Sequence, residues 1–464
     1  MPKPLRHILL LTALLPLAVA LTLSGCTKEA DYLHDGSANA LSFSCDTLAF
    51  DTVFTTLGTT TRQMRVYNHG SQPVMLSAVT MQQGRASQFR LNVDGDTSLV
   101  ARNIRIDAGD SMFLFIQATI NPTDQSALFI VEDAILFDVE GCGTQRLPVT
   151  AWGRNAVYHV PTDTLRDEQG HPFTDRYGNP YAYSVINCSA WDHTRAHVIV
   201  GYAVIDTDST LALTAGDELY FANGAVLWAY NGGTLTVNGS EEQPVLFTSM
   251  RHDGWYRDLP GQWGHIWLGG VSGGSSRNCS IHYAKIENSY YGIIADSNDY
   301  NQPTLTISHT EIGHIKVAAI QADDAWIVGS RLLLYDCGGA TIYVPFGGRY
   351  TFSNITSANY WRLDHRETPS VILANWYESR EGIVLRDLTE ATFTDCIIYG
   401  SHSDGELLLD QKEGAAFGTT FDNCIIRGTR WDEDPQFEDP DHHDYHPKEG
   451  SPAAAIGYYA TSSK

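Results

Sequence analysis

Tryptophan and tyrosine gather beside arginine, aspartate and asparagine in three segments of this chain. The segments cover residues 251–263, 359–366 and 375–381. An apolar ring face next to hydrogen-bonding groups is the combination that sugar rings and protein hot spots use. We therefore predict ligand binding through these loops, with contacts from Trp255, Tyr256, Trp263, Trp361, Arg362, Trp376 and Tyr377. The alternative is that the loops fold back and pack on the scaffold that carries them.

Carboxylates that could carry acid–base chemistry occur at Asp323-Asp324 and between Asp432 and Asp441. Glycosidases need two carboxylates, one as acid and one as base or nucleophile. Adjacent residues on a strand point to opposite faces, so Asp323 and Asp324 are better explained as part of a turn. The second run lacks the spacing of an EF-hand loop and is better explained as a solvated surface. The sequence therefore predicts no catalytic residue.

Three histidines near the C-terminus raise the question of a metal site; these are His442, His443 and His446. Neither they nor the cysteines follow the spacing of a zinc finger or a zincin. We favour surface histidines, and the sequence predicts no metal ion and no cofactor.

The elements that must position the aromatic loops are short strands rather than helices. Between residues 201 and 249, leucine recurs at every eighth position on short apolar runs bounded by Gly, Asn or Asp. These leucines are Leu211, Leu219, Leu227 and Leu235. The i, i+3, i+4, i+7 spacing of an amphipathic helix is absent. Three strand-and-turn units add up to about twenty-four residues, which is within the range for one coil of a parallel β-solenoid.

Six later segments repeat one pattern of apolar and small residues and extend the predicted solenoid. Their spacing is irregular, which a solenoid tolerates because each coil contacts only its neighbours. The last two are close copies and place Cys396 and Cys424 at the same position, where we expect stacked core thiols rather than a bridge. The six segments are Ile281–Ile286, Ile307–Ile312, Ile327–Leu332, Phe352–Ser357, Phe393–Ile398 and Phe421–Ile426.

The fold class predicted from these patterns is all-β. A right-handed single-stranded parallel β-helix is expected over residues 198–430. A β-sandwich would instead show hairpins without repeated copies in register, which fits this half of the chain less well. Residues 155–197 are expected to form a linker and the N-terminal cap of this helix. Residues 431–464 are expected to form its C-terminal cap, with apolar cover from Phe437, Tyr445 and Pro452.

Residues 41–154 differ from the rest, with about eight short strands bounded by turn residues, and predict an antiparallel β-sandwich. Hairpins are expected at Asn68-His69-Gly70 and at residues 140–143. Cys45 and Cys142 would lie at one end of such a sandwich, so a disulfide between them is possible. Residues 50–74 resemble the opening strands of immunoglobulin-like modules of the abnormal-spindle and hydin type. This resemblance implies a spacer or an interaction surface.

The N-terminus has the layout of a secretory signal, with a basic start, an apolar run over residues 8–22 and small residues before Cys26. Its Leu-Ser-Gly-Cys box resembles the bacterial lipoprotein signal. That resemblance implies a signal peptide over residues 1–25, lipidation at Cys26 and a tether over residues 26–40. The alternative is an ordinary signal peptide with a coincidental cysteine. Residues 28–31 resemble the acidic export tag of surface lipoproteins in Bacteroidetes.

The formal net charge of −24 argues against nucleic acid as a partner, because its phosphates are bound by clustered lysine and arginine. Leader, sandwich and solenoid together resemble a family of Bacteroidetes surface lipoproteins with a right-handed parallel β-helix of the pectin-lyase-like type. The resemblance implies an outer-membrane lipoprotein anchored through its N-terminal lipid and exposed at the cell surface.

Two functions are compatible with that architecture. The first is non-enzymatic binding of a glycan or a surface protein through the loops. The second is a polysaccharide lyase or glycoside hydrolase on the same scaffold, since fold alone does not fix activity. Polygalacturonase-like β-helix enzymes place an Asp-Asp motif before their His and Lys motifs. In this chain the segment Gly313–Lys316 precedes Asp323-Asp324, which is the reverse order, so we favour binding.

Overall fold

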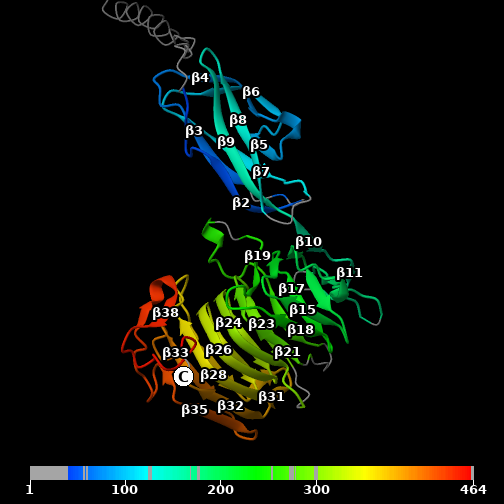
Figure 1. The fold of residues 1–464 in the computed structure, drawn as a ribbon, viewed down its shortest axis with the longest axis vertical. Coiled ribbons are helices and arrows are strands. Elements are labelled where there is room, and N and C mark those ends of the chain that lie inside the picture. Colours follow the sequence, from blue (N-terminus) through cyan, green and yellow to red (C-terminus); the bar gives the residue numbers. More distant parts are fainter. Residues whose placement is uncertain are drawn as a thin grey trace, which may run out of the picture. The chain divides into compact units, whose positions relative to one another are not determined.

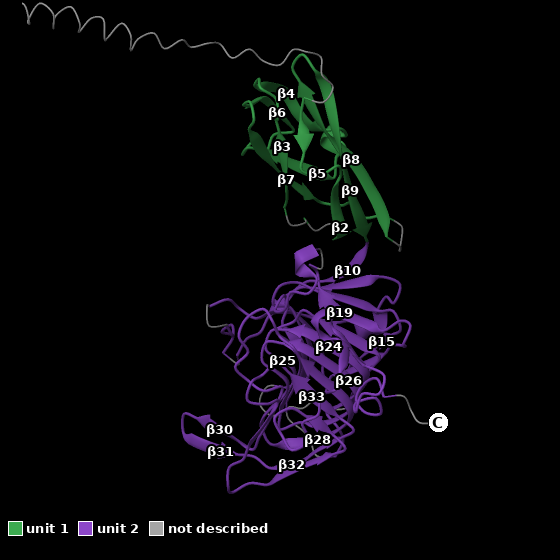
Figure 2. Cartoon of the chain, turned by 90° about the vertical axis from the view of Figure 1, so that its left-hand side faces the viewer, with its two compact units in different colours: residues 1–124, 128–154 green, residues 125–127, 155–464 purple. Residues whose placement is uncertain are grey.

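The computed structural model describes residues 40–460, apart from 56, 57, 59, 60, 124–127, 168, 175–177, 252, 253, 271–275, 277 and 297–300. The predicted leader and Cys26 lie outside the described residues. Strands dominate the described part of the chain, and no α-helix occurs in it (Figure 1). The chain divides into two compact units, with the boundary between Arg154 and Asn155 (Figure 2).

The first unit consists of two sheets that share one apolar core. One sheet has the order β1 (Ser42–Phe43), β3 (Arg62–Tyr67), β7 (Ser111–Ala118) and β5 (Phe89–Val93). The other has the order β2 (Leu48–Phe54), β9 (Gly143–Arg154), β8 (Phe129–Val139), β4 (Val74–Met81) and β6 (Val100–Ile106). In β7, Leu114 and Ile116 are buried while Phe113 and Phe115 are exposed, which is the alternation of a strand with one covered face.

The two predicted hairpins of this unit have different outcomes. β8 and β9 pair antiparallel up to Val139 and Gly143, so the turn at residues 140–143 is a hairpin. The prediction at Asn68 is wrong, because β3 and β4 belong to different sheets. The buried Asn68 amide donates hydrogen bonds to the carbonyl oxygens of Gln72, Ile106 and Asp107, and thereby fastens the crossing between the sheets.

The second unit contains two long sheets whose neighbouring strands are parallel, apart from β11 against β12. The ten-stranded sheet has the order β11 (Asp163–Thr164), β12 (Ala182–Val185), β14 (Tyr202–Ile205), β17 (Val226–Tyr230), β20 (His265–Gly269), β23 (Tyr291–Asp296), β25 (Ala318–Asp323), β27 (Ala340–Phe346), β29 (Val371–Ala374) and β34 (Leu407–Asp410). Its strands alternate along the chain with those of the other long sheet. This arrangement is compatible with a β-helix.

The second long sheet has fifteen strands. Its main path is β10 (Ala156–His159), β13 (Ala196–Ile199), β16 (Glu218–Phe221), β19 (Val245–Ser249), β22 (Ala284–Glu287), β24 (Leu305–Ile315), β26 (Trp326–Cys337), β28 (Gly348–Asn359), β32 (Leu388–Thr394) and β35 (Phe417–Asp422). Beside this path lie β15 (Thr210–Thr214), β18 (Thr234–Asn238), β21 (Cys279–His282), β33 (Ile397–Gly400) and β36 (Ile425–Ile426). Parallel pairing thus begins at Ala156, within the segment predicted as a linker and cap.

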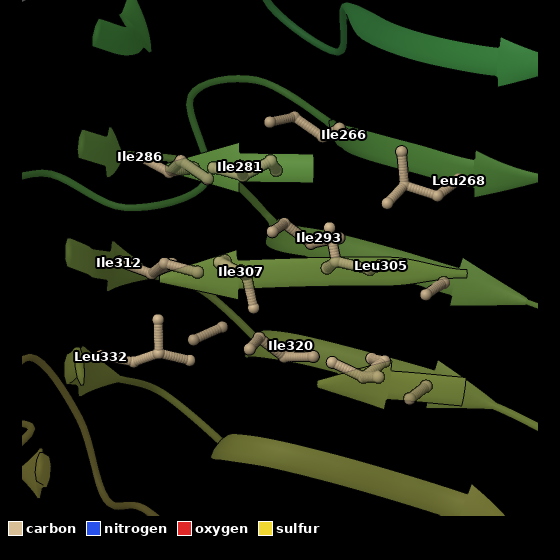
Figure 3. Packing of buried hydrophobic residues seen from close by; sticks show 14 of the residues in the cluster. Ile266, Leu268, Ile281, Ile286, Ile293, Leu305, Ile307, Ile312, Ile320 and Leu332 are labelled. Carbon is tan, nitrogen blue, oxygen red and sulfur yellow. The ribbon is translucent and has the colours of Figure 1, made fainter. Parts of the chain in front are cut away.

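The leucine repeat marks successive strands of this unit. Leu211 on β15 pairs with Leu235 on β18, and the chain passes through β16 with Leu219 and β17 with Leu227 in between. All four side chains are buried in one core cluster. We call one such passage of the chain a rung. Each rung adds isoleucine, leucine or valine side chains to the interior between the sheets (Figure 3).

Five of the six predicted segments are in register, and one is shifted by two residues. Ile307 pairs with Gly329 rather than with Ile327, so the matching segment is 329–334. A Cβ atom at Gly329 would lie 2.6 Å from the ring of Phe352, which occupies the same position one rung later. The glycine makes room for that ring, and its lack of a side chain hides the register from an apolar pattern.

Two rows of left-handed residues mark corners of the rungs. The first corner row runs through Tyr283, His309, Arg331, Asn354, Asp395 and Asn423, one residue per rung. The second corner row runs through Asn288, His314 and Asp336, which directly follow the paired residues Glu287, Gly313 and Tyr335. Asn, Asp and His tolerate this conformation better than most residues, so the corners constrain both composition and spacing.

The C-terminal segment places Trp431 on Phe421 of the last rung, but the predicted cover residues Phe437 and Tyr445 lie elsewhere. It forms the hairpin of β37 (Phe437–Asp439) and β38 (Asp444–Pro447) and packs beside the rungs. Phe437 and Tyr445 are buried with Leu333 and Tyr335, whose neighbours Leu332 and Leu334 face the interior on the opposite side of β26. The predicted cover residue Pro452 is exposed. The segment is therefore a side cover.

The cysteine predictions concern two pairs. Cys396 and Cys424 are both buried in the core cluster, and their thiols donate to the backbone carbonyls of Thr394 and Asp422. Cys45 and Cys142 both pack against the core of the first unit. No disulfide is formed among the cysteines of the described part, so the Cys45–Cys142 bridge stays a prediction that non-reducing peptide mapping can test.

Candidate functional site

The first aromatic loop divides into an exposed tip and a buried base. Trp255 is 76% exposed, and the guanidinium carbon of Arg251 lies 3.4 Å from the ring centre of Tyr256. Trp263, in contrast, is fully buried, stacks on Phe221 with ring centres 4.0 Å apart and donates to the carbonyl of Glu287. The predicted ligand contact of Trp263 is therefore corrected, because its ring belongs to the core.

The second aromatic loop is also folded back. Trp361 is buried and donates from Nε1 to Asp364, so its predicted ligand contact is corrected as well. Arg362 is exposed and forms an ion pair with Asp441 of the C-terminal segment. A buried ion pair holds the loop, with Arg366 nitrogens 2.6 and 2.9 Å from the two carboxylate oxygens of Glu406.

The third aromatic loop is a hairpin of β30 (Trp376–Ser379) and β31 (Gly382–Leu385). Trp376 is half-buried, with the ammonium of Lys412 3.6 Å from its ring centre. Tyr377 is exposed and packs against Phe346. Of the seven predicted contact residues, Trp255, Tyr377 and Arg362 thus remain exposed, and Tyr256 and Trp376 are partly exposed.

An acidic pair that the sequence reasoning missed lies on the ten-stranded sheet. Asp296 ends β23 and pairs in register with Asp323 at the end of β25. Trp267 donates from Nε1 to Asp296 over 2.9 Å, and Gln321 donates to Asp323. Gly269 lies beside Asp296 on the preceding rung, where a Cβ atom would overlap the carboxylate. The repeated sequence Ile-x-Ala-Asp at residues 293–296 and 320–323 was the signal that could have revealed this pair.

The electrostatics of the acidic pair suit proton transfer. Burial, with a smaller contribution from the neighbouring charge of Asp323, raises the pKa of Asp296 to about 6 against the opposing hydrogen bond from Trp267. Burial also raises the pKa of Asp323. One of the two carboxyl groups therefore holds its proton at a pH where an ordinary aspartate is ionised. Such a pair can act as general acid and base.

A groove of about 550 Å³ lies on the other long sheet, between the first corner row and the end of the C-terminal segment. We call it the tyrosine groove. Tyr283 stacks on His309 with ring centres 4.5 Å apart, and His446 lies 3.8 Å from Tyr459. Burial raises the pKa of Tyr459, so its hydroxyl stays protonated. The remaining polar lining includes Glu241, Lys285, Glu311 and Arg331.

A third cluster joins the second corner row to the C-terminal segment. His314, Asp336 and His443 each place a metal-binding atom within 4.8 Å of the others. His443 belongs to the histidines that the sequence reasoning assigned to the surface. His314 and Asp336 are buried and lie on adjacent rungs, a relation that spacing alone does not reveal.

Comparisons with known proteins give only partial similarities. No family model and no curated protein matches the chain. Among solved structures, a protein of unknown function from Porphyromonas gingivalis is similar at 17% identity over 26% of this chain and 49% of that chain, with a TM-score of 0.19. A family 123 glycoside hydrolase from Clostridium perfringens is similar at 9% identity over 27% of this chain and 28% of that chain, with a TM-score of 0.19. A PapD-like domain from a human protein also matches, at 12% identity over 29% of this chain and 94% of that chain, with a TM-score of 0.17. The chain spans less than half of the first two structures, and these TM-scores assign neither fold nor function.

Proposed function

We propose that this protein is a surface lipoprotein whose right-handed parallel β-helix displays a glycan-binding groove. The preceding two-sheet unit, an immunoglobulin-like sandwich in this proposal, acts as a spacer between the lipid anchor and the β-helix. The observation that carries the binding function is the tyrosine groove, which is lined by partly exposed aromatic rings together with carboxylate and cationic side chains. Ring faces stack on sugars, and the charged groups accept and donate the hydrogen bonds that hydroxyl groups require.

The binding proposal is tested on a glycan array with the full chain, followed by calorimetry on the glycans it retains. Tyr459→Ser and Tyr283→Asn remove ring faces from the groove, and asparagine accepts the left-handed backbone at position 283. Each variant should weaken binding about tenfold, since a buried ring contributes about 1.5–3 kcal/mol. Tyr290→Ser is the matched control, because Tyr290 is exposed outside the groove. Equal binding by all variants would refute the assignment to this groove.

The anchoring part of the proposal rests on the Leu-Ser-Gly-Cys box. Among the described residues, no helix has the length and apolar character needed to cross a bilayer. Cys26→Ala should release the protein from the membrane fraction or block its processing. A variant that stays membrane-bound and is processed like the wild type would contradict lipid anchoring at Cys26.

A second candidate function, cleavage of a polysaccharide, is favoured by the acidic pair. Neighbouring strands are about 4.8 Å apart, close to the ~5–5.5 Å between the carboxyl groups of retaining glycosidases. The test is release of reducing ends from a panel of polysaccharides. Asp296→Asn and Asp323→Asn should abolish the activity, and Asp324→Asn, next to the pair, should retain it. Activity that survives both substitutions in the pair would exclude it as the catalytic site.

A further inference from the structure

The cluster of His314, Asp336 and His443 joins two parts of the chain that are far apart in sequence. His314 lies next to the C-terminal end of β24, and Asp336 holds the corresponding position of β26, one rung later. His443 follows the short turn at Pro440–His442 in the C-terminal segment. Within the described ranges, this is the one group of at least three His, Cys, Asp or Glu side chains with donor atoms close enough for a shared metal ion.

The two residues from the rungs are fixed before any ion binds. Nδ1 of His314 lies 2.8 Å from Oδ2 of Asp336, and both side chains are largely buried. The His314 ring packs against the ring of Tyr335 at an angle of 81° between the ring planes. The hydrogen bond places two metal-binding atoms next to each other, and a bound ion would replace the proton that they share.

The third residue is held by the C-terminal segment. Nδ1 of His443 lies 3.2 Å from the hydroxyl of Tyr445, which is buried against the rungs. The rings of His314 and His443 are 4.9 Å apart and nearly perpendicular. Asp258 of the first aromatic loop is 4.0 Å from Nε2 of His314 and is 68% exposed in its side chain, so a further carboxylate lies within reach.

Near His443, the residue types at the position of the second corner row differ from those on the rungs before and after. Asn288 holds the rung before His314, and Asn359 follows in the register after Asp336. Both asparagines use their side chains to hold backbone: Asn288 donates to the carbonyls of Arg257 and Leu259, and Asn359 to that of Gly339. Of the two, only Asn288 has the left-handed conformation of the corner row, and asparagine tolerates that conformation. The imidazole and carboxylate between the asparagines add metal-binding groups to that backbone role.

We propose that His314, Asp336 and His443 bind a divalent transition-metal ion of the zinc type. Two imidazoles and a carboxylate suit zinc and its neighbours, whereas calcium and magnesium prefer sites made of oxygen alone. Bonds of about 2.0–2.2 Å place the donors around a tetrahedral ion about 3.4 Å apart. The 4.8 Å limit of the present cluster requires a small movement, which the His443 side of the cluster can supply because that residue is exposed. The ion ties the C-terminal segment to β24 and β26.

The experiment titrates the chelator-treated full chain with ZnCl₂ by calorimetry and with CoCl₂ by visible absorption. We expect one ion per chain and cobalt bands typical of nitrogen and oxygen ligands. His443→Ala should lower the affinity at least tenfold and abolish these bands. His314→Asn should do the same, because asparagine fits its left-handed backbone, and a melting curve shows that each variant folds. Zinc should slow hydrogen exchange in residues 433–458 at least tenfold in the wild type only.

The matched controls are His442→Ala and His446→Ala, which remove exposed histidines of the same segment. His442 is 82% exposed in its side chain and pairs with Asp439, and His446 pairs with Asp444. Both variants should bind zinc like the wild type. Equal affinity of His443→Ala and wild type, or equal losses in all three histidine variants, would overturn the proposal and show adventitious surface binding. This test is independent of glycan binding, because its only ligands are the metal ions.

Discussion

Two clusters of ionisable side chains in the second unit arise from the same geometric rule and have opposite properties. In the acidic pair, the register brings together two carboxyl groups, and repulsion adds to burial in raising the pKa of Asp296. One rung-to-rung step elsewhere brings His314 to Asp336, where the two groups are complementary and form a 2.8 Å hydrogen bond. In a stack of parallel strands, side chains at equivalent positions of adjacent strands are neighbours. The residue types at that position therefore decide whether the two side chains repel each other or form a hydrogen-bonded pair.

The largest expected effect concerns the C-terminal segment, which packs over the histidine cluster and not over the acidic pair. Tyr445→Ala should cost about 3–5 kcal/mol in the packing of the C-terminal segment, because it removes a buried ring between that segment and β26. Hydrogen exchange in residues 433–458 should become fast, while the titration of Asp296 stays unchanged. His442→Ala, at an exposed position of the same segment, is the control. Unchanged protection in Tyr445→Ala would show that the segment is held elsewhere.

The acidic pair should lose stability as the pH rises. The folded-state pKa of Asp296, about 6, lies above its ordinary value of 3.8, so the folded protein binds its proton more tightly than the unfolded chain does. Stability from this group is complete below pH 4 and is lost as the pH rises to about 6, by up to about 3 kcal/mol. Asp296→Asn should therefore stabilise the protein at pH 7.5 and not at pH 4. Denaturant unfolding curves at pH 7.5 and pH 4 measure this change in the free energy of unfolding, with Asp324→Asn as the control.

The same change of aspartate to asparagine should have the opposite sign in the other cluster. Asp336→Asn keeps a residue that tolerates the left-handed backbone but loses the charged acceptor of the His314 hydrogen bond. We expect a loss of about 1–2 kcal/mol at pH 7 in metal-free buffer. Denaturant unfolding curves of Asp296→Asn and Asp336→Asn, measured under the same conditions, compare the two changes in the free energy of unfolding directly. Changes of the same sign in both would show that register pairing does not govern these sites.

The smallest expected effect on stability concerns the exposed aromatic tip. Trp255→Ala should change the free energy of unfolding by less than about 0.5 kcal/mol, because surface positions contribute little. If this loop contacts the ligand, binding of the glycan selected on the array should weaken about tenfold. Trp376→Ala tests the hairpin in the same way. A large drop in melting temperature without a change in binding would assign these rings to the scaffold.

The repeat of the second unit was accessible from sequence because each rung reuses the same apolar positions. The pairing of Leu211 with Leu235 follows from spacing alone. The shift at Gly329 did not follow, since a glycine that accommodates a neighbouring ring leaves no apolar signal. Asn68 was misread for a related reason: its turn residues signal a reversal but do not tell which sheet the next strand joins.

The candidate sites were harder to predict than the strands. Spacing identified aromatic loops but could not tell that Trp263 and Trp361 turn inward, because burial depends on what lies one rung away. The acidic pair required knowledge of the register between β23 and β25. The histidine cluster also required the return path of the C-terminal segment, and no periodic pattern encodes that path.

That return path has a practical consequence for how the protein is made and handled. Tyr458 donates to Glu311, which lies 147 residues earlier, and Arg331 donates to the carbonyl of Ala460. A chain truncated after Ile426 would keep every rung, but it would leave Leu333 and Tyr335 open to other truncated chains. Fragments cut short during synthesis should therefore aggregate despite a normal strand content in circular dichroism. The same truncation would also remove Tyr458, Tyr459 and Ala460 from the lining of the tyrosine groove.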